Sequence, residues 1–107
     1  MSFGLFVHFK LKSGSEEDFD NLVAKTLSLI QENEPDTFVY ATHSVQTDPR
    51  ERVFYELYRD HAAFMRHEEQ PYVQRFLSER KQFVERVAVT FLSLLDAKGI
   101  SSGNEEL

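Results

Sequence analysis

Residues 52–76, RVFYELYRDHAAFMRHEEQPYVQRF, contain the pattern that decides the fold. The first seven residues alternate between two faces, which predicts a β-strand. One face carries Phe54, Glu56 and Tyr58, and the other carries Val53, Tyr55 and Leu57. Asp60 is a favourable helix N-cap, and a helical pattern follows it through residues 61–69. Pro71 then restarts the helix, because proline is favoured at the first helical position.

The chain on either side of this segment supplies three more strands and one more helix. Strands are predicted over residues 3–11, 37–46, 52–58 and 87–95, with a polar turn over residues 47–51. Ser15 and Asp18 approximate a capping box for a helix that ends near Asn33, before Pro35. An apolar stripe extends the helix that restarts at Pro71 to about Arg86.

The resulting order, β-α-β-β-α-β, predicts an α+β protein of ferredoxin-like topology. Such a fold has a four-stranded antiparallel sheet with two helices on one face. Residues 3–96 form this single domain, and residues 97–107 form a polar C-terminal tail. Several strands are apolar on both faces, whereas helices cover only one face of the sheet. We therefore expect a homodimer that buries the helix-free faces.

Composition excludes several classes of function. The net charge of −6 argues against a nucleic-acid partner, and the absence of cysteine excludes disulfides and thiolate chemistry. The N-terminal apolar run is too short for a membrane span and lacks a signal-peptide pattern, so we expect a cytoplasmic protein without a membrane partner. His61 and His67 are six residues apart and do not share a helix face, and no metal-ligand spacing or dinucleotide fingerprint occurs. We expect no metal and no cofactor.

Two segments carry a resemblance to a known family. The first segment is residues 34–40, EPDTFVY. The second is residues 54–76, in which the characteristic positions are occupied by Glu56, Tyr58, Asp60, Ala63 and His67. They resemble the helix-to-strand junction and the third-strand and second-helix signature of the antibiotic-biosynthesis-monooxygenase-like family of dimeric α+β barrels. The resemblance extends over roughly residues 3–96 and implies the same fold and dimer.

The family includes cofactor-free monooxygenases of quinols and aromatic polyketides, haem-degrading oxygenases, and an isomerase of a phosphorylated signal molecule. Leu77 stands where the haem-degrading branch has its axial histidine, and the chain has no tryptophan, so haem degradation is not expected. Asp36 replaces the usual glycine of the junction, which should alter only a turn. The resemblance thus implies a small-molecule substrate and leaves its identity open.

His67 is the main candidate for catalysis, because a histidine on the sheet-facing side of a helix can act as a general base near neutral pH. We expect Glu56 to face His67 and orient its ring; a purely structural pair is the alternative. Substrate-binding candidates are Tyr40, Phe54, Tyr58, Phe64, Tyr72 and Phe76. Arg75 and Arg80 are expected outside the pocket, and His8 and His43 at the surface or in the dimer interface.

Three functions follow from these candidates. The first is a cofactor-independent monooxygenase-like enzyme that acts on a small aromatic or quinol-type compound. The second is an isomerase or degrader of a small oxygenated metabolite in the same pocket. The third is a non-catalytic binding module in which Phe54, Phe64 and Phe76 fill the pocket.

Overall fold

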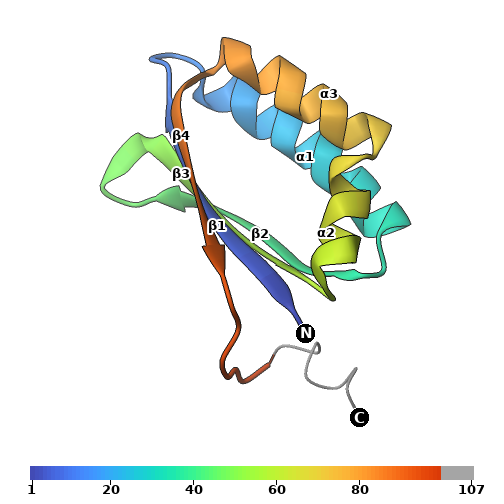
Figure 1. The fold of residues 1–107 in the computed structure, drawn as a ribbon. Coiled ribbons are helices and arrows are strands. Elements are labelled where there is room, and N and C mark those ends of the chain that lie inside the picture. The colour runs from blue at the N-terminus through green and yellow to red at the C-terminus, as the bar shows by residue number, and fades with distance from the viewer. Residues whose placement is uncertain (100–107) are drawn as a thin grey trace.

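The computed structural model describes residues 1–99 and has the predicted ferredoxin-like α+β architecture (Figure 1). In chain order the elements are β1 (Phe3–Leu11), α1 (Glu16–Asn33), β2 (Thr37–Val45), β3 (Asp48–Tyr58), α2 (His61–Glu68), α3 (Pro71–Glu79), a 3-10 turn η1 (Arg80–Gln82) and β4 (Val84–Leu92). Most of the predicted tail, residues 100–107, lies outside the described residues.

The four strands form one antiparallel sheet in the order β2-β3-β1-β4. All three α-helices lie on one face of this sheet (Figure 1). The central strands β1 and β3 are paired so that Val7 lies opposite Phe54 and Leu5 lies opposite Glu56. These side chains therefore point toward the helices, as the alternating pattern predicts.

Aromatic side chains fill the layer between helices and sheet. Phe9, Phe19 and Phe54 are each at most 1% exposed, and the ring centroids of Phe9 and Phe54 are 4.8 Å apart. Phe19 of α1 lies 5.2 Å from Phe9, which joins the long helix to the central strand. Several of the ten phenylalanines of the chain therefore form the core between the helices and the sheet.

The two predicted helix caps have different outcomes. The carboxylate of Asp60 accepts a hydrogen bond from the backbone N–H of Ala63 at 2.8 Å, which confirms the cap of α2. Ser15 precedes α1 as predicted, but its side chain makes no capping hydrogen bond. Its backbone, at φ −100° and ψ 4°, departs from the extended conformation usual for an N-cap, so the predicted capping box is wrong.

Two strand boundaries also differ from the prediction. The predicted turn is largely strand: β3 begins at Asp48, which is paired with Val45 of β2. The side chain of Lys10 donates to the Asp48 carboxylate, and the side chain of Arg50 donates to the carbonyl of Leu11. The last helix ends at Glu79, and β4 spans Val84–Leu92 instead of residues 87–95. Here the backbone N–H of Lys12 donates to the carbonyl of Phe83. In both places, pairing with a neighbouring strand, β2 for the start of β3 and β1 for the start of β4, outweighs the local sequence preference.

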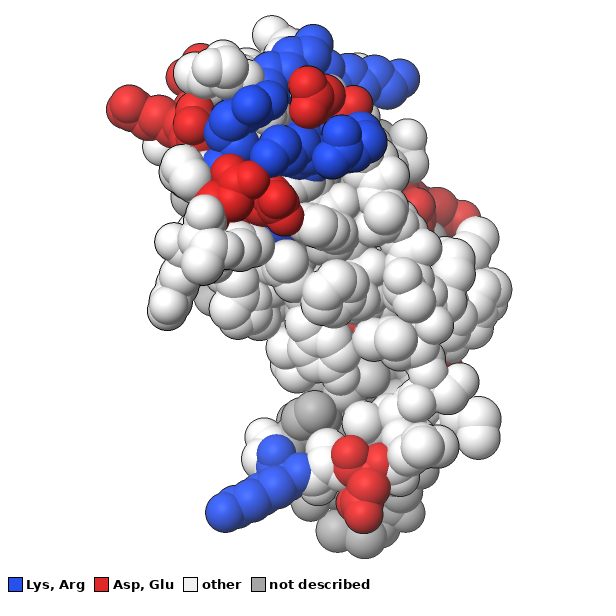
Figure 2. All heavy atoms as spheres, turned by 90° about the vertical axis from the view of Figure 1, so that its left-hand side faces the viewer, with Lys and Arg blue, Asp and Glu red and all other residues white. Residues whose placement is uncertain are grey.

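The helices of the chain leave apolar surface uncovered. Val87, Val89 and Phe91 lie opposite helix-facing residues of β1, yet they are 42%, 47% and 61% exposed. On the helix-free face, Phe6 is 39% exposed. Figure 2 shows a broad area without charged side chains across the centre of one side of the molecule. A single chain therefore does not bury all of its apolar sheet surface.

Candidate functional site

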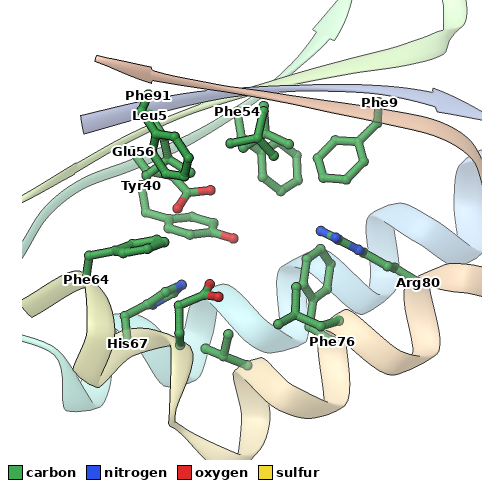
Figure 3. A pocket seen from close by; sticks show the side chains of 15 residues that line it. Leu5, Phe9, Tyr40, Phe54, Glu56, Phe64, His67, Phe76, Arg80 and Phe91 are labelled. Carbon is green, nitrogen blue, oxygen red and sulfur yellow. The ribbon is translucent and has the colours of Figure 1, made fainter. Parts of the chain in front are cut away.

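A cavity of about 190 Å³ lies between the helix-facing side of the sheet and the helices α2 and α3 (Figure 3). Six of the predicted site residues line it: Tyr40, Phe54, Glu56, Phe64, His67 and Phe76. The remaining lining residues are Leu5, Val7, Phe9, Glu68, Val73, Leu77, Arg80, Val89 and Phe91. Most of the wall is apolar, and its few polar groups can orient a ligand.

His67 is the buried histidine of this site. It lies on α2 one turn after Ala63, on the face that packs toward the sheet, and only 4% of its side chain is exposed. Aromatic rings surround it, with centroids 5.1 Å away for Tyr58 and 5.7 Å away for Tyr40. Figure 3 shows the imidazole directed into the cavity.

The hydrogen-bond partner of His67 is Glu34, which we did not predict. Nδ1 of His67 is 2.8 Å from Oε1 of Glu34, and the Glu34 side chain is 7% exposed. Glu34 is the C-cap residue of α1, directly before the turn into β2. The only sequence signal for it was its place in the 34–40 junction segment, where it was treated as a mark of the fold.

Glu34 is held as a carboxylate by three donors. Thr37 donates to Oε1 at 2.7 Å, Tyr72 donates to Oε2, and His67 supplies the third bond. Burial raises the pKa of Glu34, but these hydrogen bonds outweigh burial and hold the pKa below its usual value. An ionised Glu34 accepts only, so Nδ1 of His67 is the donor of this hydrogen bond. In the neutral tautomer that donates through Nδ1, Nε2 is an acceptor.

Glu56 lines the same cavity with a different partner. It is 5% exposed, and the hydroxyl of Tyr58 donates to its Oε1 at 2.6 Å. Burial raises the pKa of Glu56 to about 7, against the opposing effects of the Tyr58 hydrogen bond and the nearby His67. The expectation that Glu56 and His67 are direct partners is therefore wrong, because each is satisfied by another residue.

The tyrosines of the site have distinct positions. Tyr40 lines the cavity, and burial followed by the charge of Glu56 raises the pKa of its hydroxyl. Tyr58 and Tyr72, both predicted as substrate-binding residues, are not among the lining residues. Instead, Tyr58 donates a hydrogen bond to Glu56, and Tyr72 donates one to Glu34. Burial and the adjacent carboxylates raise the pKa of both, so they remain hydrogen-bond donors.

The two arginines near the pocket differ in position. Arg75 is exposed and pairs with Glu79, as expected for a residue outside the cavity. Arg80, also expected outside, instead lines the cavity. Its guanidinium carbon lies 5.5 Å from the ring centroid of Phe9 and 5.6 Å from that of Phe76. Arg80 follows Phe76 by four residues, and this helical spacing could have indicated a shared face.

A second hollow, of about 220 Å³, lies on the outer side of the His67–Glu34 pair. It is lined by Asn33, Glu34, Pro35, Asp36, Thr37, Ala63, Arg66, His67 and Gln70. His67 borders both the hollow and the inner cavity, whereas Glu34 borders only the hollow. The pair thus connects the inner cavity to the outer surface.

The other three histidines, His8, His43 and His61, are not among the lining residues of the cavity. His8 pairs with Glu51, and the exposed His43 approaches the carbonyl of Val53 at 3.3 Å. Within residues 1–99, no group of three or more histidine, aspartate or glutamate side chains could hold a metal ion. No helix in this part of the chain is long and apolar enough to cross a membrane.

The geometry defines a small ferredoxin-like α+β protein with a buried histidine–glutamate pair beside an apolar cavity. The family model for antibiotic biosynthesis monooxygenases matches residues 2–79, and the chain belongs to this family. A comparison with curated proteins gave no match.

Solved structures share the fold at low sequence identity. PA3566 from Pseudomonas aeruginosa is 20% identical, with 89% of this chain and 95% of that chain covered and a TM-score of 0.80. Rv0793 from Mycobacterium tuberculosis is also 20% identical, with 91% and 98% covered and a TM-score of 0.83. SO0527 from Shewanella oneidensis is 22% identical, with 85% and 88% covered and a TM-score of 0.79.

Proposed function

We propose that this protein is a cofactor-independent, monooxygenase-like enzyme that acts on a small aromatic or quinol-type compound. The observation that carries the proposal is His67, which is buried against an apolar cavity and bonded at Nδ1 to the carboxylate of Glu34. This arrangement leaves Nε2 as a base for a hydroxyl group in the cavity. Membership of the antibiotic biosynthesis monooxygenase family supports this class of reaction.

The first step is removal of a phenolic proton by Nε2 of His67. Glu34 stabilises the imidazolium that forms, because its pKa is held low by three donors. The proton then leaves toward the outer hollow that borders both residues. The inner cavity keeps the phenolate in apolar surroundings that exclude water.

The phenolate is itself the reductant of dioxygen in the second step. It transfers an electron to dioxygen, and the radical pair combines to form a carbon–oxygen bond at a ring carbon that lies ortho or para to the hydroxyl and carries hydrogen. Loss of the ring proton and cleavage of the O–O bond then give a quinone and water. One oxygen atom enters the ring and the other leaves as water, so one phenol and one dioxygen yield one quinone and one water.

An isomerase or degrader of a small oxygenated metabolite is the second candidate function. The observation that favours it is Arg80, a cation in the cavity wall that could hold an anionic substrate. His67 would then remove a proton from carbon beside a carbonyl, without consuming dioxygen. A non-catalytic module is less well supported, because Phe54, Phe64 and Phe76 line the cavity and leave it unfilled.

Oxygen uptake by the purified protein with a panel of phenols and quinols tests the proposal. His67→Gln should reduce turnover by roughly 100-fold or more, and Glu34→Gln should also reduce it, because a positioned base contributes on that scale. His61→Gln is the matched control, since His61 is exposed and is not a lining residue. Substrate turnover without oxygen uptake would support the isomerase, and full activity of His67→Gln would refute the assigned base.

The enzyme is proposed to act as a homodimer joined through its helix-free sheet face and the adjoining edge at β4. The motive is the exposure of Phe6 on the helix-free face and of Val89 and Phe91 at the β4 edge. Val89 and Phe91 line the cavity, so a partner that covers them would also close it. A stable monomer in light scattering at micromolar concentration would contradict this assembly.

A further inference from the structure

The cavity has two chemically different ends (Figure 3). At one end the imidazole of His67 lies beside the ring of Phe64, with ring centroids 6.4 Å apart. At the other end the guanidinium of Arg80 enters between Phe9 and Phe76. A ligand that spans the cavity therefore meets a base at one end and a cation at the other.

Within the described residues 1–99, Arg80 differs from every other arginine in having no acidic partner. Ion pairs hold the others: Arg50 and Arg86 with Glu85, Arg52 with Asp20, Arg59 and Arg66 with Asp36, and Arg75 with Glu79. For Arg80, no hydrogen bond or ion pair of the side chain exists within residues 1–99, and its guanidinium contacts two aromatic faces. The acidic side chains Glu56 and Glu68 act on it only through space, and burial outweighs their effect and lowers its pKa. A partly buried cation without a counter-ion is costly, so an anion that enters the cavity is favoured there.

We propose that Arg80 binds the carboxylate of an aromatic hydroxy acid whose hydroxyl group is presented to His67. The inference rests on the proposed function for the role of His67 and adds the class of substrate. The guanidinium offers two parallel N–H donors, which match the two oxygens of a carboxylate. The rings of Phe9, Phe54 and Phe76 provide apolar walls for an aromatic ring between the two ends.

The charges around the cavity favour a monoanion over a phosphate dianion. Glu56 and Glu68 also line the cavity, and each acts on Arg80 through its negative charge when it is ionised. One guanidinium can neutralise a carboxylate, whereas a dianion would leave excess negative charge beside two acidic side chains. The cavity volume of about 190 Å³ also suits a compound of one ring better than a larger one.

The test compares three ligands by isothermal titration calorimetry. The probes are 4-hydroxybenzoate, its neutral analogue 4-hydroxybenzamide, and phenyl phosphate. Wild-type protein should bind the acid roughly 10-fold or more tightly than the amide, because a charged hydrogen-bonded pair contributes on that scale. Arg80→Gln should abolish this preference, Arg80→Lys should restore part of it, and Arg75→Gln should retain all of it. Thermal melts verify that each variant is folded.

Three results would overturn the proposal. The first is that the wild-type protein binds acid and amide equally, or binds neither at millimolar concentration. This result is measured on the wild-type protein alone. The second is an equal loss of both ligands in Arg80→Gln, which would assign Arg80 to packing of Phe9 and Phe76. The third is tighter binding of phenyl phosphate than of 4-hydroxybenzoate.

Failure of the proposed anion site at Arg80 can be distinguished from failure of the proposed monooxygenase activity. Arg80-dependent binding of the acid without oxygen uptake from any phenol would retain the anion site and remove the monooxygenase. Oxygen uptake from neutral phenols that is unaffected by Arg80→Gln would retain the enzyme and remove the anion site.

Discussion

Replacing Glu56 with glutamine should stabilise the protein above pH 7 and leave its stability near pH 4.5 almost unchanged. Glu56 is buried on β3, and its ionised form is disfavoured there because burial raises its pKa to about 7. Glutamine has the same shape and cannot ionise. Its Oε1 can still accept the hydrogen bond that Tyr58 now gives to the carboxyl group.

The folded and unfolded chains bind the Glu56 proton with different affinity, and this difference decides how the free energy of unfolding changes with pH. Below pH 4.5 the glutamate is protonated in both states, so its titration does not affect stability. Between pH 4.5 and about 7 the unfolded chain releases the proton first, and stability falls as pH rises. A pKa displaced from 4.5 to about 7 corresponds to about 3 kcal/mol lost above pH 7. Glu56→Gln removes this loss.

Urea denaturation of wild type and variant at pH 4.5 and pH 8 measures the effect. The free energy of unfolding of Glu56→Gln relative to wild type should rise by about 3 kcal/mol between the two pH values. Any constant cost of burying the amide cancels in this comparison. Glu69→Gln, at an exposed glutamate of the same region, is the control and should show little change. A difference that is independent of pH would refute the argument that Glu56 is desolvated in the folded state.

Three other predictions concern Glu34, the dimer and one turn. Tyr72→Phe removes a donor to Glu34, so carbon-13 NMR titration should give that carboxyl a higher pKa than in the wild type; an unchanged value would contradict the assigned contact. Phe6→Glu should shift the protein toward monomers in light scattering, whereas Lys12→Glu, in an exposed turn, should not. Gly14→Ala should lower the free energy of unfolding by about 1 kcal/mol, because Gly14 has φ +81°; an unchanged urea midpoint would argue against that conformation.

The fold could be predicted because its decisive patterns are periodic. Alternation in β1 and β3 places Val7 and Phe54 on the same side of the sheet, and helical spacing places His67 beneath Ala63. The repeat of a strand or a helix can be recognised from residues that are close in sequence. The beginning of β3 and of β4 could not be found in this way. The first residue of β3, Asp48, is paired with Val45 across the hairpin, at an irregularity in the register, and the first residue of β4, Val84, is paired with Leu11 of β1, which is distant in sequence.

The polar contacts of the site were less predictable for a related reason. His67 and Glu34 are 33 residues apart, and Glu34 lies at a helix end, where no period applies. Glu56 was assigned to His67 because strand alternation gave it the correct face. Facing the same cavity does not make two residues partners, since Tyr58 lies closer to Glu56 and satisfies it. Which donor reaches which carboxylate depends on tertiary geometry.

The two carboxylates near His67 have opposite pKa displacements, and this difference suits them for different tasks. Glu34, with three donors, remains ionised and fixes the ring of His67. Glu56, with one donor and deep burial, holds a proton up to about pH 7. The proposed reaction needs both a base for the hydroxyl and a proton for the oxygen that leaves as water. Such divergent pKa values in one site are typical of paired base and acid roles.

If Glu56 supplies that proton, kcat of the wild-type enzyme should fall as pH rises through about 7, because the carboxyl group then ionises. Glu56→Gln should turn over more slowly below pH 7 and should lack this descending limb, since its amide does not titrate. Glu69→Gln should keep the wild-type profile. Oxygen uptake measured from pH 5.5 to pH 9 distinguishes these outcomes. An identical descending limb in Glu56→Gln would show that another group titrates there, and Glu56 would then have no part in proton transfer.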